Sequence, residues 1–170
     1  METPKRDGND VPLVREAVRA VVLDRDNRVL LFKAFRDGRR SQHFWITPGG
    51  GVTAGESAPN ALRRELAEEC GLVAYALGPL IWVREHVFAL PGSGQLIRQG
   101  ERFYLVRVDQ HDVDVTGWDE FERTFLGEHR WWTIGEIEVS GDEFAPRRLA
   151  HFLAAVVDGY LPSEPVDTGI

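Results

Sequence analysis

The sequence has little cysteine and no long apolar segment. A single cysteine, Cys70, occurs among its 170 residues, so no disulfide can form within the chain, which is compatible with a reducing cytoplasm. No apolar run is long enough to cross a bilayer, and residues 1–10 lack the apolar core of a signal peptide. From these absences we expect a cytoplasmic protein that does not bind a membrane.

An excess of positive charge is also absent. Lys and Arg number 20 against 27 Asp and Glu, which gives a formal net charge of −7. Nucleic acid polymers and anionic membranes are bound through basic surfaces, so we expect neither as a partner. A small anionic ligand is compatible with an acidic protein, because a bound divalent cation can reverse the sign of the local charge.

The length favours a single domain with one sizeable core. We expect residues 1–13 to form a flexible N-terminal arm, residues 14–160 to form the domain, and residues 161–170 to form a C-terminal tail. The acidic and poorly periodic residues 109–128 are expected to be a long loop. Apolar, β-branched and alternating patterns predict strands over residues 14–23, 28–34, 44–47, 77–88, 102–108 and 130–133.

Three helices are expected as well. The first begins after Ser57, a good N-cap residue, and ends at Gly71, a good C-cap residue. A capping-box pattern that starts at Thr133 predicts a second, short helix. The last helix begins near Pro146 and ends at Gly159. By pattern alone, the chain therefore contains both α and β structure.

The first helix carries three glutamates, Glu65, Glu68 and Glu69, at spacings that place them on one side. Like charges this close together destabilise a helix, and Arg63 and Arg64 are too near Glu65 in sequence to cover the whole cluster. Mg²⁺ prefers oxygen ligands and often binds between a few carboxylates and substrate phosphates. A glutamate-rich helix face by itself is more often a solvated surface, so the case for a site needs further residues.

Those residues lie before the helix and at its end. Positions from Gly50 to Leu72 read glycine, five residues, glutamate, seven residues, Arg-Glu, an aliphatic residue, any residue, Glu-Glu, any residue, glycine and an aliphatic residue. This pattern resembles the Nudix box without a mismatch, and the Pro48-Gly49-Gly50 lead-in and Trp131-Trp132 are also similar to the family. The resemblance implies an α/β protein with a Nudix-type α/β/α sandwich and a mixed β-sheet. It further implies a hydrolase that cleaves a diphosphate linkage with Mg²⁺ or Mn²⁺.

The resemblance also implies roles for the residues of the box. Glu56 is expected to pair with Arg64 and to hold the glycine loop against the helix, a contact that suits a bidentate Arg–carboxylate pair. Among the expected metal ligands, Glu65 and Glu69 are the first candidates for direct contact. The full expected set is the carbonyl oxygen of Gly50 and the carboxylates of Glu65, Glu68 and Glu69.

Activation of the attacking water needs a base. By similarity to the family, this base is either a box glutamate or a glutamate on a distant loop. Glu68 is the candidate in the box. Glu120, Glu122 and Glu128 are the candidates in the loop, and we group Glu128 with the box glutamates as catalytic. For each loop glutamate taken alone, a solvated surface charge explains the residue equally simply.

A few residues outside the box are candidates for substrate contacts. Arg36 and Arg40 belong to a basic cluster that could bind a substrate phosphate, although a solvated turn explains them as well. Arg84 and His86 would share one face of a strand and could line a nucleotide pocket. Glu101 opens a strand and could reach the metals.

The sequence does not distinguish between three classes of small nucleotide as the substrate: nucleoside triphosphates, nucleotide sugars and dinucleoside polyphosphates. Two other functions also stay open. One is a catalytically weak Nudix domain that senses a nucleotide and regulates a partner, and the other is an interaction protein with an incidental acidic helix. The family resemblance makes a homodimer plausible.

Overall fold

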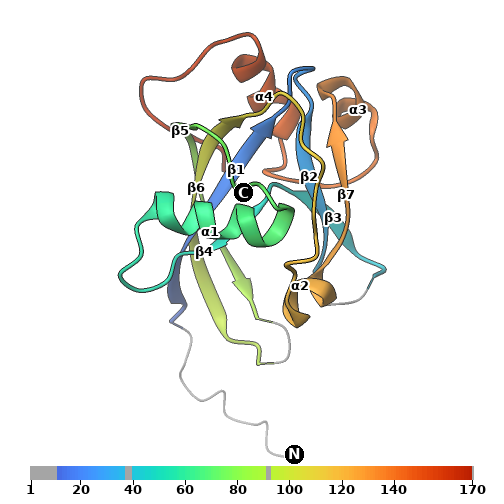
Figure 1. Cartoon of the computed structure of the whole chain (residues 1–170). Coiled ribbons are helices and arrows are strands. Elements are labelled where there is room, and N and C mark those ends of the chain that lie inside the picture. Colours follow the sequence, from blue (N-terminus) through green and yellow to red (C-terminus); the bar gives the residue numbers. More distant parts are fainter. Residues whose placement is uncertain (1–10, 37–39, 91–92, 170) are drawn as a thin grey trace, which may run out of the picture.

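The structure of the protein is a computed structural model, and it describes residues 11–36, 40–90 and 93–169 (Figure 1). One curled mixed sheet has the strand order β8-β3-β2-β1-β6-β5-β9, with β4 paired to β1 and β7 paired to β2. The helices are α1 (Ala58–Cys70), α2 (Glu120–Phe125), α3 (Ile134–Val139) and α4 (Leu149–Val157). The strands are β1 (Leu13–Leu23), β2 (Val29–Phe35), β3 (His43–Ile46), β4 (Gly49–Gly51), β5 (Leu77–Ala89), β6 (Leu96–Arg107), β7 (Leu126–Trp132), β8 (Phe144–Ala145) and β9 (Val166–Asp167).

The pairing of the central strand β1 determines where the short strand β4 joins the sheet. It runs parallel to β6 along its whole length, from the pair Leu13–Ile97 to the pair Leu23–Arg107. It pairs with β2 at Leu23 and Val29, next to the turn between the two strands. Further back along β1, its neighbour is the three-residue strand β4. Strand β4, which we call the glycine strand because it consists of Gly49–Gly51, therefore lies against the middle of the sheet.

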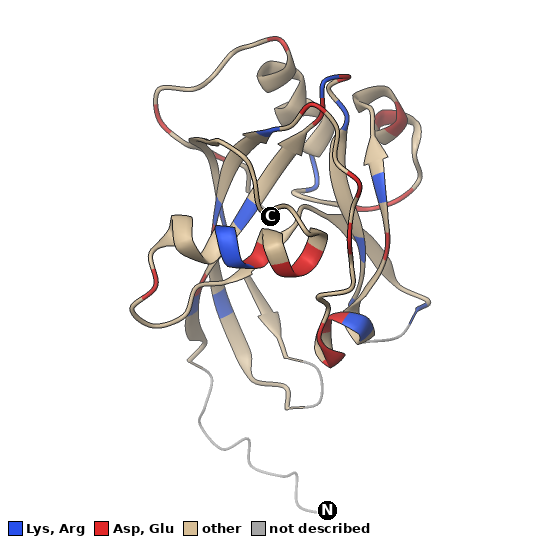
Figure 2. Ribbon diagram, in the orientation of Figure 1, with Lys and Arg blue, Asp and Glu red and all other residues tan. Residues whose placement is uncertain are grey.

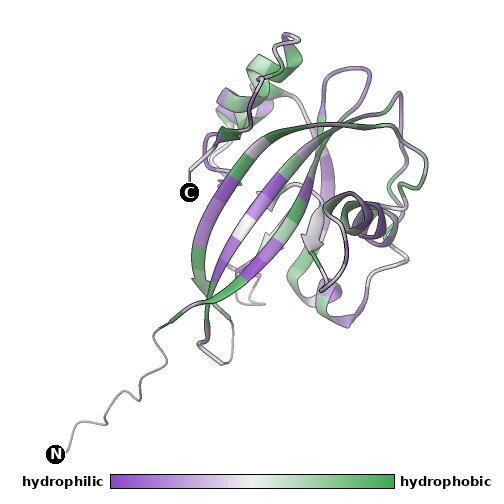
Figure 3. Cartoon of the chain, turned by 90° about the vertical axis from the view of Figure 1, so that its left-hand side faces the viewer, coloured by the Kyte–Doolittle hydropathy of each residue, from purple (hydrophilic) through white to green (hydrophobic). Residues whose placement is uncertain are grey.

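Side chains that alternate along β1 build two separate cores. On one face, Val18, Ala20 and Val22 pack with α1, including Leu62 and Leu66. On the other face, the core contains Val21, Leu23, Trp82, Phe103, Leu149, Leu153 and Val156, the last three from α4. The side view shows α1 and the C-terminal helix on opposite sides of the strands (Figure 3). The expected α/β sandwich with a mixed sheet is confirmed.

The ends of α1 follow the sequence closely. The Ser57 side chain accepts a hydrogen bond from the backbone N–H of Asn60. At the other end, Gly71 has a φ of 67° and donates to the carbonyl of Ala67. A residue with a Cβ is disfavoured in this left-handed conformation, so glycine is the natural C-cap.

Three segments differ from the sequence-based expectation. Strand β6 begins at Leu96, before the expected start at residue 102, because pairing to both β1 and β5 orders its polar first half. The expected loop over residues 109–128 contains α2 and the first residues of β7. The expected tail includes β9, where Val166 pairs with Trp82 and the buried Thr168 donates to the Val83 carbonyl. Residues 166–168 are therefore attached to the sheet.

The boundary at the other end also shifts, because Leu13 already belongs to β1. Residues 1–10 of the expected arm lie outside the described residues. Within the described part of the chain, no helix is long and apolar enough to cross a membrane.

Candidate active site

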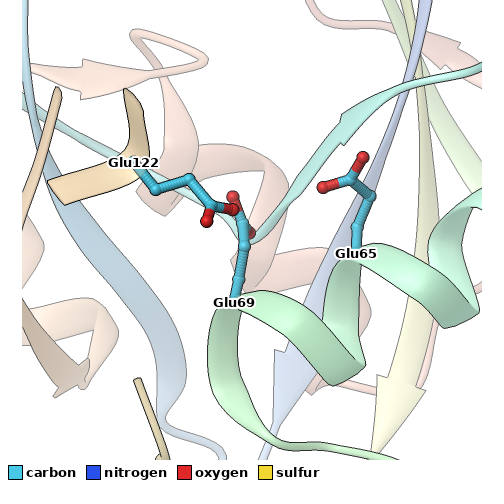
Figure 4. A group of neighbouring side chains, drawn as sticks. All are labelled: Glu65, Glu69 and Glu122. Carbon is cyan, nitrogen blue, oxygen red and sulfur yellow. The ribbon is translucent and has the colours of Figure 1, made fainter. Parts of the chain in front are cut away.

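Three carboxylates from two helices meet at one point. Glu65 and Glu69 come from α1 and Glu122 comes from α2, and their carboxylate oxygens lie within 4.8 Å of one another. Figure 4 shows the three side chains pointing toward a common space. Acidic segments of α1 and α2 face each other in the charge-coloured view (Figure 2). We call Glu65, Glu69 and Glu122 the acidic cluster.

Glu69 is the most deeply enclosed member of the acidic cluster. It is 6% exposed, and its Oε2 accepts a hydrogen bond of 2.7 Å from the backbone N–H of Gly49. Burial raises the pKa of Glu69 to about 8, although Arg19 and the Gly49 N–H oppose this rise. The carboxylate form therefore lacks sufficient compensation from the protein itself.

Glu65 lies one helical turn earlier and is also buried. Burial raises its pKa, while a hydrogen bond of 2.6 Å from Arg64 Nη1 partly offsets the rise. A Cβ at Gly50 would lie 2.5 Å from the Glu65 carboxylate, which is closer than any real contact allows. A side chain at the first glycine of the box would therefore displace the Glu65 carboxylate.

The expected contact between Glu56 and Arg64 is present. Arg64 donates from Nε to Glu56 Oε1 at 3.1 Å and from Nη2 to Glu56 Oε2 at 2.9 Å. Arg64 Nη2 also donates to the Gly51 carbonyl at 3.0 Å. The hydrogen bonds from Arg64 and Thr53 lower the pKa of Glu56 to about 2. Through these contacts Arg64 joins the glycine strand, the loop after it and Glu65.

Glu122 reaches the acidic cluster because the segment before it is bound to the C-terminal end of α1. Trp118 Nε1 donates to the Glu69 carbonyl at 2.8 Å, and the Trp118 ring packs 5.8 Å from that of Phe32. Asp119 then caps α2, and Glu122 Oε2 accepts from the Asp119 N–H at 2.7 Å. Burial raises the pKa of Glu122, and the neighbouring acids add to the rise.

The structure does not bring all the predicted carboxylates together. Glu68 lies outside the acidic cluster, with a side chain 49% exposed and its Oε2 3.5 Å from Arg64 Nη1. Glu128 lies on β7 and forms an ion pair of 2.5 Å with Lys33, which lowers its pKa. Glu120 is exposed on α2. Of the three loop candidates, only Glu122 joins Glu65 and Glu69 among the described residues.

The predicted arginines are also engaged elsewhere. Arg36 forms an ion pair with Glu143 and stacks over the ring of Phe44. The Arg40 guanidinium lies 5.3 Å from the centre of the Phe35 ring. Both arginines are exposed at the surface of the protein.

Arg84 is buried, and it binds Glu101 through a hydrogen bond of 2.7 Å from Nε to Oε2. Glu101 therefore faces arginines instead of the acidic cluster. Burial alone would raise the pKa of Glu101, but Arg19, His86 and Arg84 together hold it well below its usual range.

Comparison with known proteins identifies the family. The family model described as the NUDIX domain matches residues 13–155. The chain belongs to the Nudix family. A relative from Erwinia tasmaniensis, named RNA pyrophosphohydrolase, is 32% identical over 84% of this chain and 85% of its own length. A protein of the same name from Cronobacter sakazakii is 31% identical over 89% of this chain and 88% of its own length.

A solved structure supports the Nudix fold. The MutT protein from Methanosarcina mazei Go1 superposes with a TM-score of 0.59, at 17% identity, over 87% of this chain and 96% of that chain. Together with the family match and the two relatives, the intact box makes this chain a Nudix pyrophosphohydrolase. The names of the two relatives are at odds with the expectation, drawn from net charge alone, that no nucleic acid is involved.

The residues of the acidic cluster fit a divalent cation. All three offer carboxylate oxygens, which are the ligands that Mg²⁺ and Mn²⁺ prefer. Among the described residues, the one counter-ion in salt-bridge contact with the cluster is Arg64, which reaches Glu65 alone. The raised pKa values of Glu65, Glu69 and Glu122 show that negative charge is under-compensated at this point. A cation would supply the missing compensation.

Proposed function

We propose that the protein hydrolyses the diphosphate linkage of a small nucleotide with Mg²⁺ or Mn²⁺ held by Glu65, Glu69 and Glu122. The observation that carries this proposal is the convergence of three under-compensated carboxylates within 4.8 Å, beside the glycine strand of an intact Nudix box. Bound there, the cation would neutralise phosphate charge and make a coordinated water more acidic.

The protein's own residues have distinct parts in this proposal. Glu69 is held in place by the Gly49 N–H, and Glu65 is held by Arg64. Glu122 is the third carboxylate ligand, and the Gly50 carbonyl is the further ligand implied by the family. Arg64 and Glu56 fix strand β4, which contains Gly50, and the loop after it.

The proton of the attacking water needs an acceptor. Glu68 is our candidate, because it is the one glutamate in the helical part of the box that lies outside the acidic cluster, and its side chain is half exposed. Glu56, in the loop before the helix, is bound to Arg64. Glu68 lies on the same helix as Glu65 and Glu69, at the next position before Glu69. Of the remaining loop glutamates, Glu128 is bound to Lys33. Glu122 is already a member of the cluster.

Two classes of substrate are candidates, a small nucleotide and an RNA. A small nucleotide agrees with the net charge of −7, which disfavours long polyanions. An RNA substrate is the second candidate, and it is favoured by the name of two relatives at 32% and 31% identity. Both substrates require the same hydrolysis of a phosphoanhydride at the acidic cluster.

A hydrolysis panel with Mg²⁺ and Mn²⁺ tests the proposal. The panel contains nucleoside triphosphates, a nucleotide sugar, a dinucleoside polyphosphate and a short RNA with a 5′-triphosphate, with products identified for each. We expect metal-dependent turnover of a small nucleotide. Turnover of the RNA alone would replace the small nucleotide by the second candidate. Nucleotide binding without any turnover would favour the regulatory alternative.

The same panel run on two matched variants tests the assignment of the site. Glu122→Gln is expected to lose most of the metal-dependent turnover, because it removes one carboxylate of the acidic cluster. Glu128→Gln makes the same chemical change a few residues later, in a glutamate that binds Lys33 at the surface, and is expected to retain turnover. The reverse order of effects would move the third carboxylate of the site from Glu122 to Glu128.

A further inference from the structure

A buried ion-pair network lies behind the glycine strand, and neither the box nor the acidic cluster includes it. Its centre is Glu101 of β6, whose side chain is fully buried. Arg19 of β1 donates from Nε to Glu101 Oε1 at 3.1 Å, and Arg84 of β5 donates from Nε to Oε2 at 2.7 Å. Gln99 adds a hydrogen bond of 2.9 Å to Oε1. The carboxylate is thus held by three strand residues.

One end of this network reaches the glycine strand. The Nη1 atom of Arg19 donates to the Gly49 carbonyl at 2.7 Å and lies 3.4 Å from the Thr47 carbonyl. The N–H of Gly49 donates to Glu69 Oε2. A continuous path of hydrogen bonds therefore runs from Arg84 through Glu101, Arg19 and Gly49 to Glu69.

Gly49 needs such support because its conformation is unusual. Its φ is 137°, and a Cβ there would lie 2.1 Å from the Val18 carbonyl oxygen. Only glycine fits this position, and glycine has wide backbone freedom. Strand β4 is three residues long, so few ladder hydrogen bonds restrict Gly49. An arginine side chain offers several donors in a rigid planar group, which can bind Glu101 and the Gly49 carbonyl together.

We infer that Arg19, held in place by Glu101 and Arg84, is a positioning residue that fixes the Gly49 peptide group and thereby the carboxylate of Glu69. This inference rests on the proposed role of Glu69 as a metal ligand. Residues that support metal ligands in this way affect metal affinity without touching the metal. Arg19 thus links the sheet to the site across the strand between them.

Hydrogen exchange at the Gly49 amide tests the first step of this path without any metal. In ¹⁵N-glycine-labelled wild-type protein, the Gly49 N–H is expected to exchange slowly because it is bound to Glu69. Arg19→Lys keeps a positive charge beside Glu101, but its single ammonium group lacks the planar set of donors. We expect faster exchange at Gly49 in this variant, and a Mn²⁺ affinity lower by about tenfold, as for other residues that support metal ligands.

Arg102→Gln is the matched control. Arg102 and Glu16 form an ion pair of 3.2 Å between the same two strands, β1 and β6, on the opposite face of the sheet. Its loss is expected to leave both Gly49 exchange and Mn²⁺ affinity unchanged. Arg84→Lys, one step further along the path, is expected to shift both quantities less than Arg19→Lys and in the same direction. It provides a second reading if Arg19→Lys does not fold.

The outcomes separate this inference from the proposed function. If the Arg19 and Arg84 variants have lower melting temperatures but wild-type Gly49 exchange and wild-type Mn²⁺ affinity, Arg19 is a purely structural residue and the inference is wrong. If the wild-type protein does not bind Mn²⁺, the proposed metal site is wrong. In that case the exchange rate at Gly49 still decides whether Arg19 positions the loop.

Discussion

Glu69 and Glu101 are two buried carboxylates with opposite surroundings. They are 6% and 2% exposed, so both are withdrawn from water. Glu101 accepts hydrogen bonds from Arg19 and Arg84, which hold its pKa below the usual range. Glu69 receives one backbone N–H and faces Glu65 and Glu122, and burial raises its pKa to about 8. Positive charge compensates the carboxylate of Glu101, whereas the carboxylate of Glu69 lacks sufficient compensation.

This difference separates a structural charge from a functional one. A buried carboxylate is costly unless counter-charges and hydrogen bonds compensate it. At Glu101 the fold provides the arginines itself. At Glu69 it provides only partial compensation, and strongly perturbed groups of this kind are typical of sites that bind or react. Loss of Glu101 should therefore damage the fold, and loss of Glu69 should damage activity.

The largest expected effect is the loss of activity in Glu69→Gln. The amide keeps the shape of the side chain but removes a carboxylate ligand, so metal-dependent hydrolysis should fall by more than the roughly 10- to 100-fold that is typical of residues that merely support a ligand. Stability in the absence of metal should be equal to or above that of the wild type, because a buried ionisable group is removed. Turnover with Mg²⁺ and the urea midpoint with EDTA measure the two quantities. Near-native turnover would remove Glu69 from the metal site.

Glu101→Gln should lower stability, which Glu69→Gln should not. It leaves Arg19 and Arg84 without their shared counter-charge, and breaking a buried ion pair costs about 3–5 kcal/mol. Urea unfolding measures this loss. Glu16→Gln is the control, because its exposed pair with Arg102 should contribute about 1 kcal/mol or less. Equal losses in the two variants would mean that burial does not distinguish Glu101.

The two carboxylates also differ in how far the sequence predicts them. The sequence predicts Glu65 and Glu69 as a pair, because a helix and a box fix their spacing locally. Glu122 is part of an Asp-x-x-Glu capping box at the start of α2, a local signal that would have separated it from Glu128. The position of Glu122 beside Glu69, however, depends on Trp118, which donates to the Glu69 carbonyl 49 residues away in sequence. Such a contact has no local signature.

The surroundings of Glu101 depend entirely on strand register. Arg84 and Glu101 are opposite each other only because β5 pairs with β6 after irregularities between Leu77 and Trp82. A shift of one residue would turn Arg84 to the other face of the sheet. The helices and most strands follow from periodicity and caps, whereas this register and the attachment of β9 arise from tertiary pairing.

A pair of opposite pH dependences is also expected in the metal-free protein. Glu69 has a pKa of about 8 in the fold against an ordinary value of 4.5. Between these values the folded protein binds more protons than the unfolded chain, so Glu69 makes stability fall as pH rises from about 5 to 8. For Glu101 the folded pKa is lowered, so its contribution is present above its ordinary pKa and is lost as pH falls through the folded value.

Urea unfolding across this pH range with EDTA measures the dependence, and Glu69→Gln isolates the contribution of Glu69 from that of the rest of the protein. The variant should lose less stability between pH 5 and 8 than the wild type. Mn²⁺ should change the sign of the Glu69 contribution, because the ion binds the deprotonated carboxylate and stabilises the folded state that holds it. The same pH slope in the wild type and in Glu69→Gln would show that Glu69 is ionised in the fold without metal, and the contrast with Glu101 would then be lost.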